Sequence, residues 1–302
     1  MKILVVGGGG YLGSSLIGRL LDENHEVTVI DKLMWGESGV FPYRNKITVL
    51  HMDAWKLMSV EEYDVVIHLA GLVGEALCKD NEEVAKSVNS DLTAPIVKMC
   101  NDANIPLIFS STCSNYGVSK TPANEETKLI PLGVYAHTKA ASERWIQKFS
   151  DNYTILRLGT LFGVSPRMRL DTLVNQFVYE AWHDHAIEVY TPEAYRPIIH
   201  VQDACTAIIS VLGKRHREVY NVAGYNVTKG ELAEQIASYF LVPPVEVITV
   251  DKGDKRDYLV DFTKMKELGI TVEYTIEQGI SEVMKLCQDT RAYLLAEMKN
   301  YD

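Results

Sequence analysis

Tyr135 and Lys139 lie four residues apart in the stretch Gly-Val-Tyr-Ala-His-Thr-Lys, a spacing that places both side chains on one face of a helix. A free phenol has a pKa of about 10, and a fixed ammonium beside it favours the phenolate and lowers that pKa. A lowering of about three units corresponds to about 4 kcal/mol, which requires shielding from water. A bound, oxidised nicotinamide would add a second positive charge. The pair therefore indicates proton transfer beside a nicotinamide, although this spacing alone is more typical of a half-buried ring beside a solvated charge.

The N-terminus has the pattern of a strand, a glycine turn and a helix. An apolar run at 3–6 is followed by glycines at 7, 8, 9, 10 and 13 and then by leucines and isoleucines at helical spacing. Both Gly7-x-x-Gly10-x-x-Gly13 and Gly8-x-Gly10-x-x-Gly13 fit, so Gly10 and Gly13 belong to either reading. Such a turn allows a pyrophosphate to approach the helix N-terminus closely. The alternative is a turn that serves only tight packing.

An acidic residue ends the second apolar run, at 26–30. This residue, Asp31, lies 24 positions after Gly7, close to the distance at which an acid binds the ribose hydroxyls of a dinucleotide. A carboxylate at this place repels a 2′-phosphate, so NAD is favoured over NADP. The neighbouring Lys32 partly offsets that repulsion.

The composition is that of a globular enzyme without a membrane span. Of 302 residues, 47% are hydrophobic, but no uncharged stretch approaches the 20 residues of a transmembrane helix, and the N-terminus does not resemble a signal peptide. Five cysteines without C-x-x-C spacing indicate neither a disulfide framework nor a zinc or other metal site, and favour a reducing cytoplasm. The net charge of −10 argues against nucleic-acid binding. An anionic substrate must therefore meet local arginines.

Strand-like and helix-like segments alternate along the first half. Strands are expected at 2–6, 26–30, 47–51, 64–69, 106–111 and 153–157, with helices at 12–22, 82–102 and 134–149. This alternation predicts an α/β fold of the Rossmann type, a doubly wound parallel sheet covered on both faces. Further helices are expected near 171–184, 203–212, 229–240 and 275–290. We predict an NAD-binding domain at 1–160 and a smaller, mainly substrate-binding α/β lobe at 161–302, interleaved with the first.

Polar clusters follow three of the expected strands, where ligands bind in an open α/β sheet. Asp53 follows the third strand and could face an adenine amino group, although a turn-capping aspartate is equally consistent. The sequence His68-Leu-Ala-Gly71 closes the fourth strand. Thr112 closes the fifth, and its hydroxyl could hold a substrate alcohol while the proton leaves. At a strand end, such a threonine more often caps the next turn.

Six motifs in this order resemble the extended short-chain dehydrogenase/reductase family, and in particular its NAD-dependent nucleotide-sugar epimerase/dehydratase branch. They are GGGGYLG with Asp31, HLAG, FSSTCSNYG, YAHTK, LRLGTLFG and YRPIIHVQDA. The resemblance implies that Tyr135 takes a proton from a sugar hydroxyl, usually at C4, as hydride passes to the nicotinamide. It also implies that Lys139 binds the nicotinamide ribose and that Thr112 aligns the hydroxyl. The cofactor-binding residues that it implies are Gly7, Gly10, Tyr11, Leu12, Asp31, Lys32, Asp53, Ala54, Leu69, Ala70, Gly71, Ser110, Tyr135 and Lys139.

Departures from the family pattern narrow the expected reaction. The 4,6-dehydratases of the family have an Asp-Glu pair directly after the threonine, and the decarboxylating relatives have a glutamate at the position of Ser114. Here Cys113 and Ser114 follow Thr112, so both activities lose support. The leading expectation is an NAD-dependent nucleotide-sugar 4-epimerase acting through a transient 4-keto sugar. The runner-up is a one-way C4 dehydrogenase or 4-ketoreductase, and a non-catalytic NAD-sensing protein is a third possibility.

Four arginines are candidates for binding the diphosphate of such a substrate. Arg167 and Arg169 resemble an arginine-rich loop found in a subgroup of the family and could grip a diphosphate bidentately, with Asn175 bonding a sugar or phosphate oxygen. The family resemblance adds Arg196 and Arg256. We expect about half of the four arginines to touch the ligand, the others being surface ion pairs.

Three further residues are expected to be structural. Arg157 and His200 are expected to be buried and to pack, and Cys78 is more often a packed thiol than a sugar contact. Helices 82–102 and 134–149 resemble the pair that forms the dimer interface across the family, which implies a homodimer. The nucleotide (UDP, GDP, CDP or dTDP) and the sugar stay open.

Overall fold

The structure, a computed structural model, describes residues 1–250, 256–290, 295 and 298–299. Its centre is a seven-stranded, wholly parallel sheet with the order β11-β7-β5-β4-β1-β2-β3. The strands are β1 (Lys2–Val6), β2 (Glu26–Asp31), β3 (Thr48–His51), β4 (Val65–His68), β5 (Leu107–Thr112), β7 (Tyr153–Leu158) and β11 (Arg217–Val222). The predicted Rossmann-type fold is therefore confirmed, and the six predicted strands begin and end within one residue of the expected positions.

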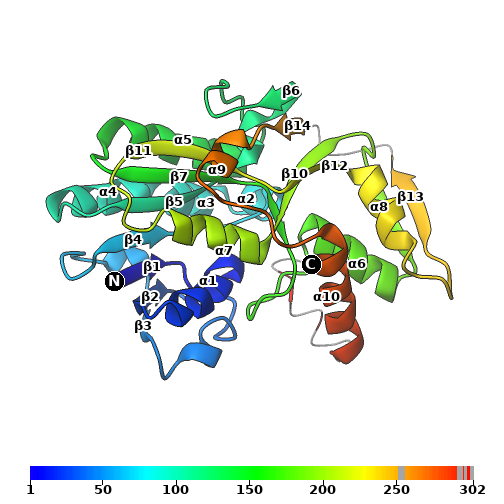
Figure 1. Cartoon of the computed structure of the whole chain (residues 1–302), viewed down its shortest axis with the longest axis horizontal. Helices are drawn as coiled ribbons and strands as arrows, with labels where there is room; N and C mark the ends of the chain where they lie inside the picture. Colours follow the sequence, from blue (N-terminus) through cyan, green and yellow to red (C-terminus); the bar gives the residue numbers. More distant parts are fainter. Residues whose placement is uncertain (251–255, 291–294, 296–297, 300–302) are drawn as a thin grey trace.

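Both faces of this sheet are covered by helices, which explains why its strands are nearly continuous apolar runs. Ile3 and Val5 belong to one core with helices α1 (Tyr11–Asp22) and α7 (Val201–Ser210). Leu4 and Val6 point the other way, into a second core with α4 (Thr93–Asp102) and α5 (Val134–Phe149). Figure 1 shows α1 and α7 on one side of the sheet and α4 and α5 on the other.

The order of the strands reverses between β1 and β4. From β1 the chain builds outward through β2 and β3, and β4, β5, β7 and β11 then extend the opposite side. Such a reversal opens a crevice at the carboxyl ends of the strands, because the connections on its two sides leave in opposite directions. The glycine turn after β1 and the His68–Gly71 turn after β4 therefore flank one crevice.

The second half of the chain forms smaller sheets and helices beside that crevice. Strands β12 (Tyr225–Thr228), β10 (Tyr195–His200) and β8 (Thr160–Phe162) form one sheet, and β9 (Ala186–Tyr190) pairs with β13 (Glu246–Val250). The helices here are α6 (Leu173–His183), α8 (Lys229–Ala237), α9 (Thr263–Glu267) and α10 (Ile276–Asp289). Helices α6, α7, α8 and α10 lie within three residues of the bounds predicted for four helices, whereas α9 was not predicted.

The two halves exchange strands. β11 of the second half forms one edge of the large sheet, and β6 (Val118–Ala123) of the first half pairs with β14 (Asp257–Val260) of the second. None of the described helices has the length and apolarity needed to cross a bilayer.

The single helix predicted at 82–102 is wrong, because the structure has three helical segments there. These are α3 (Glu82–Lys86), a π-helical stretch η3 (Ser87–Asp91) and α4. Pro95 lacks the N–H that an uninterrupted helix would bond to residue 91, and it is tolerated only because α4 begins afresh at Thr93. Within η3, the buried Asn89 side chain forms hydrogen bonds with the backbone of Leu72. Leu72 lies just before the short helix α2 (Glu75–Asp80).

Candidate active site

A cavity of about 780 Å³ occupies the crevice. All but one of the predicted site residues line it. They are Gly7, Gly10, Tyr11, Leu12, Asp31, Lys32, Asp53, Ala54, Leu69, Ala70, Gly71, Ser110, Thr112, Tyr135, Lys139, Arg167, Arg169, Arg196 and Arg256. The exception is Asn175, which is not part of the wall. Residues from the ends of β1 to β5, from α5 and from the second half thus meet at one place, as the order of the sheet requires.

The glycine turn after β1 provides a surface without side chains. Gly7 has a φ of +85°, and a Cβ on it would lie 2.4 Å from the backbone of Ala70, so only glycine fits. A Cβ on Gly8 would meet the core side chain of Val29 at 2.8 Å, and Gly8 does not line the cavity. Gly10 is the most open position, with nothing closer than 3.6 Å. Of the two spacings open in the sequence, the structure therefore favours Gly7-x-x-Gly10-x-x-Gly13.

Asp31 braces this turn while it faces the cavity. One carboxylate oxygen accepts a hydrogen bond from the Gly9 N–H at 2.8 Å, and the other accepts one from the Leu33 N–H, also at 2.8 Å. Each carboxylate oxygen has two lone pairs, so Asp31 keeps acceptor capacity for ribose hydroxyls. The structure thus gives Asp31 a positioning role that the sequence reading did not include.

Lys32 and Asp53 form an ion pair at 3.1 Å on the same wall. Asp53 also accepts a hydrogen bond from the Trp55 N–H at 3.0 Å, so it is the turn cap that the sequence left open as well as a cavity residue. The Lys32 ammonium is paired with Asp53, so it does not neutralise the Asp31 carboxylate. This arrangement fits NAD better than NADP.

Lys139 is buried below the cavity with 2% of its surface exposed. Its ammonium donates a hydrogen bond to the Ser110 carbonyl at 2.9 Å and lies 4.7 Å from the centre of the Phe109 ring. A Cβ on Gly71 would lie 3.4 Å from the same nitrogen, so the turn after β4 packs directly on the lysine. Burial lowers the pKa of Lys139 to about 8, and the charge of Glu143 opposes that lowering.

The pKa of Tyr135 differs from the sequence expectation. Burial of the Tyr135 ring raises this pKa above the ordinary value, and the electrostatic interaction with the Cys78 thiol raises it further. The charge of Arg169 and a hydrogen bond with Thr112 oppose the increase only in part. The strongest of these influences do not include Lys139. The predicted lowering of the Tyr135 pKa by Lys139 is therefore wrong for the protein's own groups, because the lysine is held on Ser110 instead.

Thr112 caps a turn and lines the cavity at once. Its hydroxyl accepts a hydrogen bond from the Ser114 N–H at 3.1 Å and lies 2.9 Å from the Ser114 hydroxyl, at the start of the short helix η4 (Cys113–Tyr116). The Cys113 thiol donates to the carbonyl of Arg157 at 3.0 Å, away from the cavity, and its burial raises the thiol pKa. The pair after Thr112 therefore provides no acid or base for removing water from a sugar.

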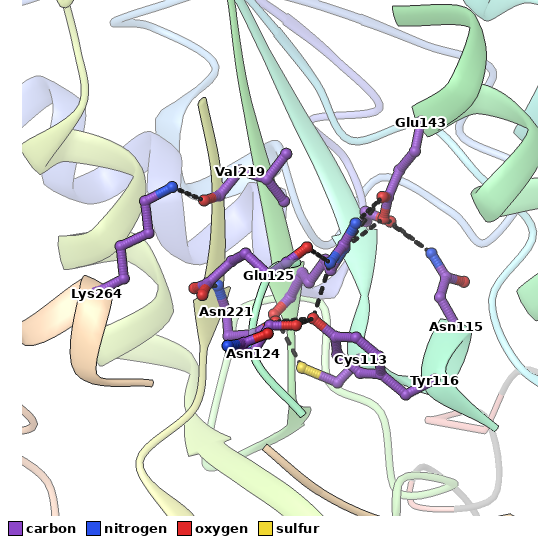
Figure 2. Close-up of polar contacts among 11 residues, drawn as sticks. Cys113, Asn115, Tyr116, Asn124, Glu125, Glu143, Val219, Asn221 and Lys264 are labelled. Atoms are coloured by element: carbon purple, nitrogen blue, oxygen red, sulfur yellow. Dashed lines mark hydrogen bonds and ion pairs between the residues drawn. The ribbon is translucent and has the colours of Figure 1, made fainter. Parts of the chain in front are cut away.

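A buried network joins the elements that position these residues (Figure 2). Glu143, on α5 one turn beyond Lys139, pairs with Arg157 of β7 at 2.8 Å, with 0% and 3% of the side chains exposed. The Glu143 carboxylate also accepts a hydrogen bond from Asn115 at 2.8 Å and one from the Ser111 hydroxyl. Arg157 donates to the Tyr116 hydroxyl at 2.8 Å. The structural role expected for Arg157 fits this environment.

Asn175 and Arg169 belong to different surroundings. Asn175 is fully buried, accepts a hydrogen bond from the Gly163 N–H at 3.1 Å and donates to the Arg169 carbonyl at 2.8 Å. The structure therefore does not bring Asn175 into contact with the space for a substrate, because its amide orders the loop instead. Arg169 does line that space, where it forms an ion pair with Asp171 at 2.7 Å and approaches the Val73 carbonyl at 3.4 Å.

At the far end of the cavity, cations gather beside β10. Arg196 is 5% exposed and donates to the carbonyl of Arg256 at 2.6 Å. Lys229, at the first position of α8, is also 5% exposed and lines the same wall. The sequence analysis missed Lys229, because a lysine at a helix start is ordinarily solvated. Only the pairing of β12 with β10, which places Thr228 opposite Tyr195, shows where this lysine lies.

Two other residues that position the site were missed: Glu75, which lines the cavity, and Asn89, which is buried behind its wall. The Glu75 carboxylate accepts a hydrogen bond from the Val134 N–H at 2.6 Å and so fixes the start of α5, directly before Tyr135. Asn89 bonds both backbone groups of Leu72, at 2.7 and 2.9 Å, and donates to Thr138 at 3.2 Å. An acidic residue in the first turn of a short helix and an asparagine inside another helical segment were the only signals. Both residues align the Tyr135 helix with the turn after β4.

Cys78 and His200 have the packing roles that the sequence favoured. The Cys78 thiol donates to the Leu72 carbonyl at 3.1 Å, and burial raises its pKa to about 12. His200 is 1% exposed, stacks on Tyr274 with 4.2 Å between ring centres, and contacts Glu282 at 3.0 Å. Neither residue lines the cavity.

Comparison with known proteins decides the family. Residues 3–223 match the NAD dependent epimerase/dehydratase family, over more than two thirds of the chain. The chain belongs to this family. The predicted family and the predicted NAD cofactor are thereby confirmed. The glycine turn, Asp31 and the Tyr135–Lys139 helix line one cavity, as the binding of such a dinucleotide requires.

Curated relatives in this family are named as 4-epimerases. The chain is 34% identical over 178 residues to a UDP-glucose 4-epimerase of Lactobacillus helveticus, covering 55% of this chain and 53% of the relative. It is 32% identical over 188 residues to a UDP-arabinose 4-epimerase of Arabidopsis thaliana, covering 56% and 45%. These matches span about half the length of the relatives. A UDP-glucose 4-epimerase of Corynebacterium glutamicum is 28% identical over 313 residues, covering 93% and 94%.

Solved structures share the fold at lower identity. A UDP-glucuronic acid 4-epimerase from Bacillus cereus has a TM-score of 0.86 at 19% identity, covering 95% of this chain and 99% of that chain. A dTDP-glucose 4,6-dehydratase from Streptomyces venezuelae also has a TM-score of 0.86, at 23% identity, covering 97% and 98%. Because an epimerase and a dehydratase match equally well, the fold does not separate the two reactions.

Proposed function

We propose that this protein is an NAD-dependent nucleotide-sugar 4-epimerase that acts through a transient 4-keto sugar. The observation that supports it most is the set of groups around Tyr135. Thr112, Tyr135 and Lys139 line one cavity, which suits removal of a hydroxyl proton, whereas Cys113 and Ser114 supply no group for eliminating water. Oxidation and reduction at one carbon remain, and the relatives named as 4-epimerases support the same reaction.

Each residue has a separate part in the proposed reaction. Bound NAD would supply the hydride acceptor for oxidation at the sugar carbon and the hydride donor for reduction of the 4-keto sugar on its opposite face. Tyr135 takes the hydroxyl proton, and Thr112, within hydrogen-bonding range of Tyr135, holds the same oxygen. Lys139 supplies a fixed positive charge and a donor at the nicotinamide ribose. Arg169, Arg196 and Arg256 line the remaining space and bind the diphosphate, which offsets the acidic surface.

A panel of nucleotide sugars tests the proposal. Purified protein is incubated with UDP-, GDP-, CDP- and dTDP-hexoses while nicotinamide absorbance and the configuration at C4 are followed. We expect an inverted sugar without net change in the cofactor. Steady accumulation of NADH would instead identify a one-way C4 dehydrogenase. Binding of NAD without turnover of any sugar would favour a non-catalytic NAD sensor.

We also propose a homodimer formed through the surface of α3, α4 and α5. The rings of Trp145 and Phe149 lie 4.3 Å apart on α5 and stay 43% and 42% exposed, which is unusual for two neighbouring aromatic side chains. Light scattering during gel filtration tests this proposal. The wild type should have twice the mass of one chain, and Trp145→Glu should elute as a monomer.

A further inference from the structure

The loop that leads to Arg167 is fastened to the first turn of α1. The Tyr11 hydroxyl donates a hydrogen bond to the Gly163 carbonyl, and the Ser165 hydroxyl donates to the Tyr11 carbonyl at 2.6 Å. The Arg167 N–H donates to the Ser14 hydroxyl at 3.1 Å, and Ser14 also lies 2.8 Å from Ser165. These contacts link residues more than 150 positions apart in the sequence. Arg167 is thereby held against the helix start that receives the dinucleotide pyrophosphate.

A second loop encloses Arg167 from the opposite side. A Cβ on Gly39 would lie 2.3 Å from the Gly9 carbonyl and 3.1 Å from the Arg167 Cβ, so the loop after β2, the glycine turn and the arginine meet there. The Arg167 guanidinium lies 5.7 Å from the ring centre of Trp35, within range of a cation–π contact. Arg167 is 4% exposed and both residues line the cavity.

Arg169 lies in a different environment, although it is only two residues away. Its guanidinium forms the ion pair with Asp171 at 2.7 Å and approaches the Val73 carbonyl, in the part of the cavity that contains Tyr135. The sequence had predicted that both arginines grip one diphosphate. The Arg167 guanidinium lies beside Trp35, in the loop after β2, whereas the Arg169 guanidinium approaches Val73, in the turn after β4, although the two charges still act on each other.

We propose that Arg167 binds the pyrophosphate of NAD rather than the diphosphate of the substrate. The first turn of α1 contains no acidic side chain, so its N–H groups and positive dipole end favour an anion. A guanidinium beside that turn adds a full positive charge and paired donors that match phosphate oxygens. Arg169 instead forms its ion pair with Asp171 and approaches the Val73 carbonyl, in the turn after β4.

Binding measurements on nucleotide-free protein test this assignment. In Arg167→Met, ADP-ribose should bind about ten- to a hundred-fold more weakly, because one charge-assisted contact to the pyrophosphate is lost. Adenosine, which has no phosphate, should bind within twofold of the wild type. So should the nucleoside diphosphate that the wild type binds best among UDP, GDP, CDP and dTDP. Arg167→Lys keeps the charge without the planar fork and should have intermediate ADP-ribose affinity.

Arg196→Met is the matched control. It should weaken the nucleoside diphosphate and leave ADP-ribose unchanged, the reverse of Arg167→Met. The assignment is overturned if Arg167→Met weakens the nucleoside diphosphate while ADP-ribose binds normally, or if it weakens neither. Should the methionine variant fail to fold, Arg167→Gln is measured with the same ligands. Because the test uses binding alone, its outcome does not depend on which sugar reaction the enzyme catalyses.

Discussion

Tyr135 shows that two residues at the right spacing need not act on each other directly. Lys139 is four positions away on α5, but its ammonium donates to the Ser110 carbonyl, and the positive charge that affects Tyr135 belongs to Arg169. Burial therefore dominates and raises the pKa of the phenol. In the proposed reaction, the protein keeps Tyr135 protonated until a cationic ligand in the cavity favours the phenolate.

Replacing Tyr135 with Phe should abolish turnover without removing cofactor binding. A positioned acid–base group contributes about 10²- to 10⁴-fold, and kcat should fall by at least that factor, while NAD binds within about threefold of wild type. Kinetics on the active nucleotide sugar and a titration with NAD measure the two effects. Tyr239→Phe, a change at a 37% exposed ring outside the cavity, is the control and should leave kcat unchanged. Unchanged turnover in Tyr135→Phe would refute the assignment of the base.

Lys139 should cost the protein stability at neutral pH. The pKa is lowered from 10.5 to about 8, so below pH 8 the folded chain contains a buried charge at a cost of about 3 kcal/mol. Between pH 8 and 10.5 the folded lysine is neutral while the unfolded one still binds a proton, so this cost decreases to zero as pH rises. Lys139→Met removes this cost but also loses the hydrogen bond to the Ser110 carbonyl, which offsets part of the gain. Nucleotide-free Lys139→Met should therefore be about 2 kcal/mol more stable than wild type at pH 7.

Urea unfolding of both proteins at pH 7 and pH 10 measures this difference, which should shrink toward zero or reverse at the higher pH. The same variant should lose turnover, because no cation remains at that place. Equal stability of the two proteins at pH 7 would show that burial of the Lys139 ammonium has no net cost.

Among the elements, α5, β7 and η4 are joined by the network of Glu143 and Arg157. Glu143 is on the same helix as Tyr135 and Lys139, Arg157 is on the strand next to β5, and Asn115 and Ser111 flank Thr112. The network therefore connects α5, which holds Tyr135 and Lys139, with the end of β5, which holds Thr112. Neither partner could be paired from the sequence, because 14 residues and a loop separate them.

Breaking this pair from one side should be costly. Glu143→Gln leaves the Arg157 guanidinium buried without its counter-charge, and the free energy of unfolding should fall by about 3–5 kcal/mol. The double variant Glu143→Gln with Arg157→Met should lose at least about 2 kcal/mol less than the sum of the single losses, because no unpaired charge remains. Urea unfolding of all four proteins gives the coupling energy.

The surface pair Lys98–Asp102 is the control for that cycle. It lies on α4 with 75% and 60% of its side chains exposed, so its removal should change stability by less than about 0.5 kcal/mol. Strict additivity of the two buried substitutions would mean that the network does not stabilise the fold as one unit.

The molecule as a whole folds from two halves that complete each other. β11 supplies one edge of the central sheet, and α7 covers the face of that sheet beside α1. The cavity likewise needs both halves, because the glycine turn and Tyr135 come from the first and Arg169, Arg196 and Arg256 from the second. The division at residue 160 therefore stays a prediction about ligand binding, and we do not expect the two halves to fold apart.

A fragment of residues 1–160 should not fold into a stable domain. It lacks β11 and α7, and would leave the apolar face that contains Ile3, Val5 and Leu16 without much of its cover. We expect no cooperative transition of the fragment in urea, followed by circular dichroism, whereas the full chain unfolds in one step. A cooperative transition of the fragment would show that the first half is an independent domain.

The sequence alone was enough to predict six of the seven strands of the central sheet, most of the helices and most of the cavity wall. Apolar runs, glycines and strand-end polar residues are local signals, and in a parallel sheet the carboxyl ends of neighbouring strands meet at one edge. Thr112, Tyr135, Lys139 and Asp31 could be found in this way. What depends on contacts between distant segments could not, since spacing says nothing of direction after a turn. The break at Ser87–Asp91, the burial that raises the Tyr135 pKa, the inward Asn175 amide and the divergence of Arg167 from Arg169 appear only when the second half of the chain packs on the first.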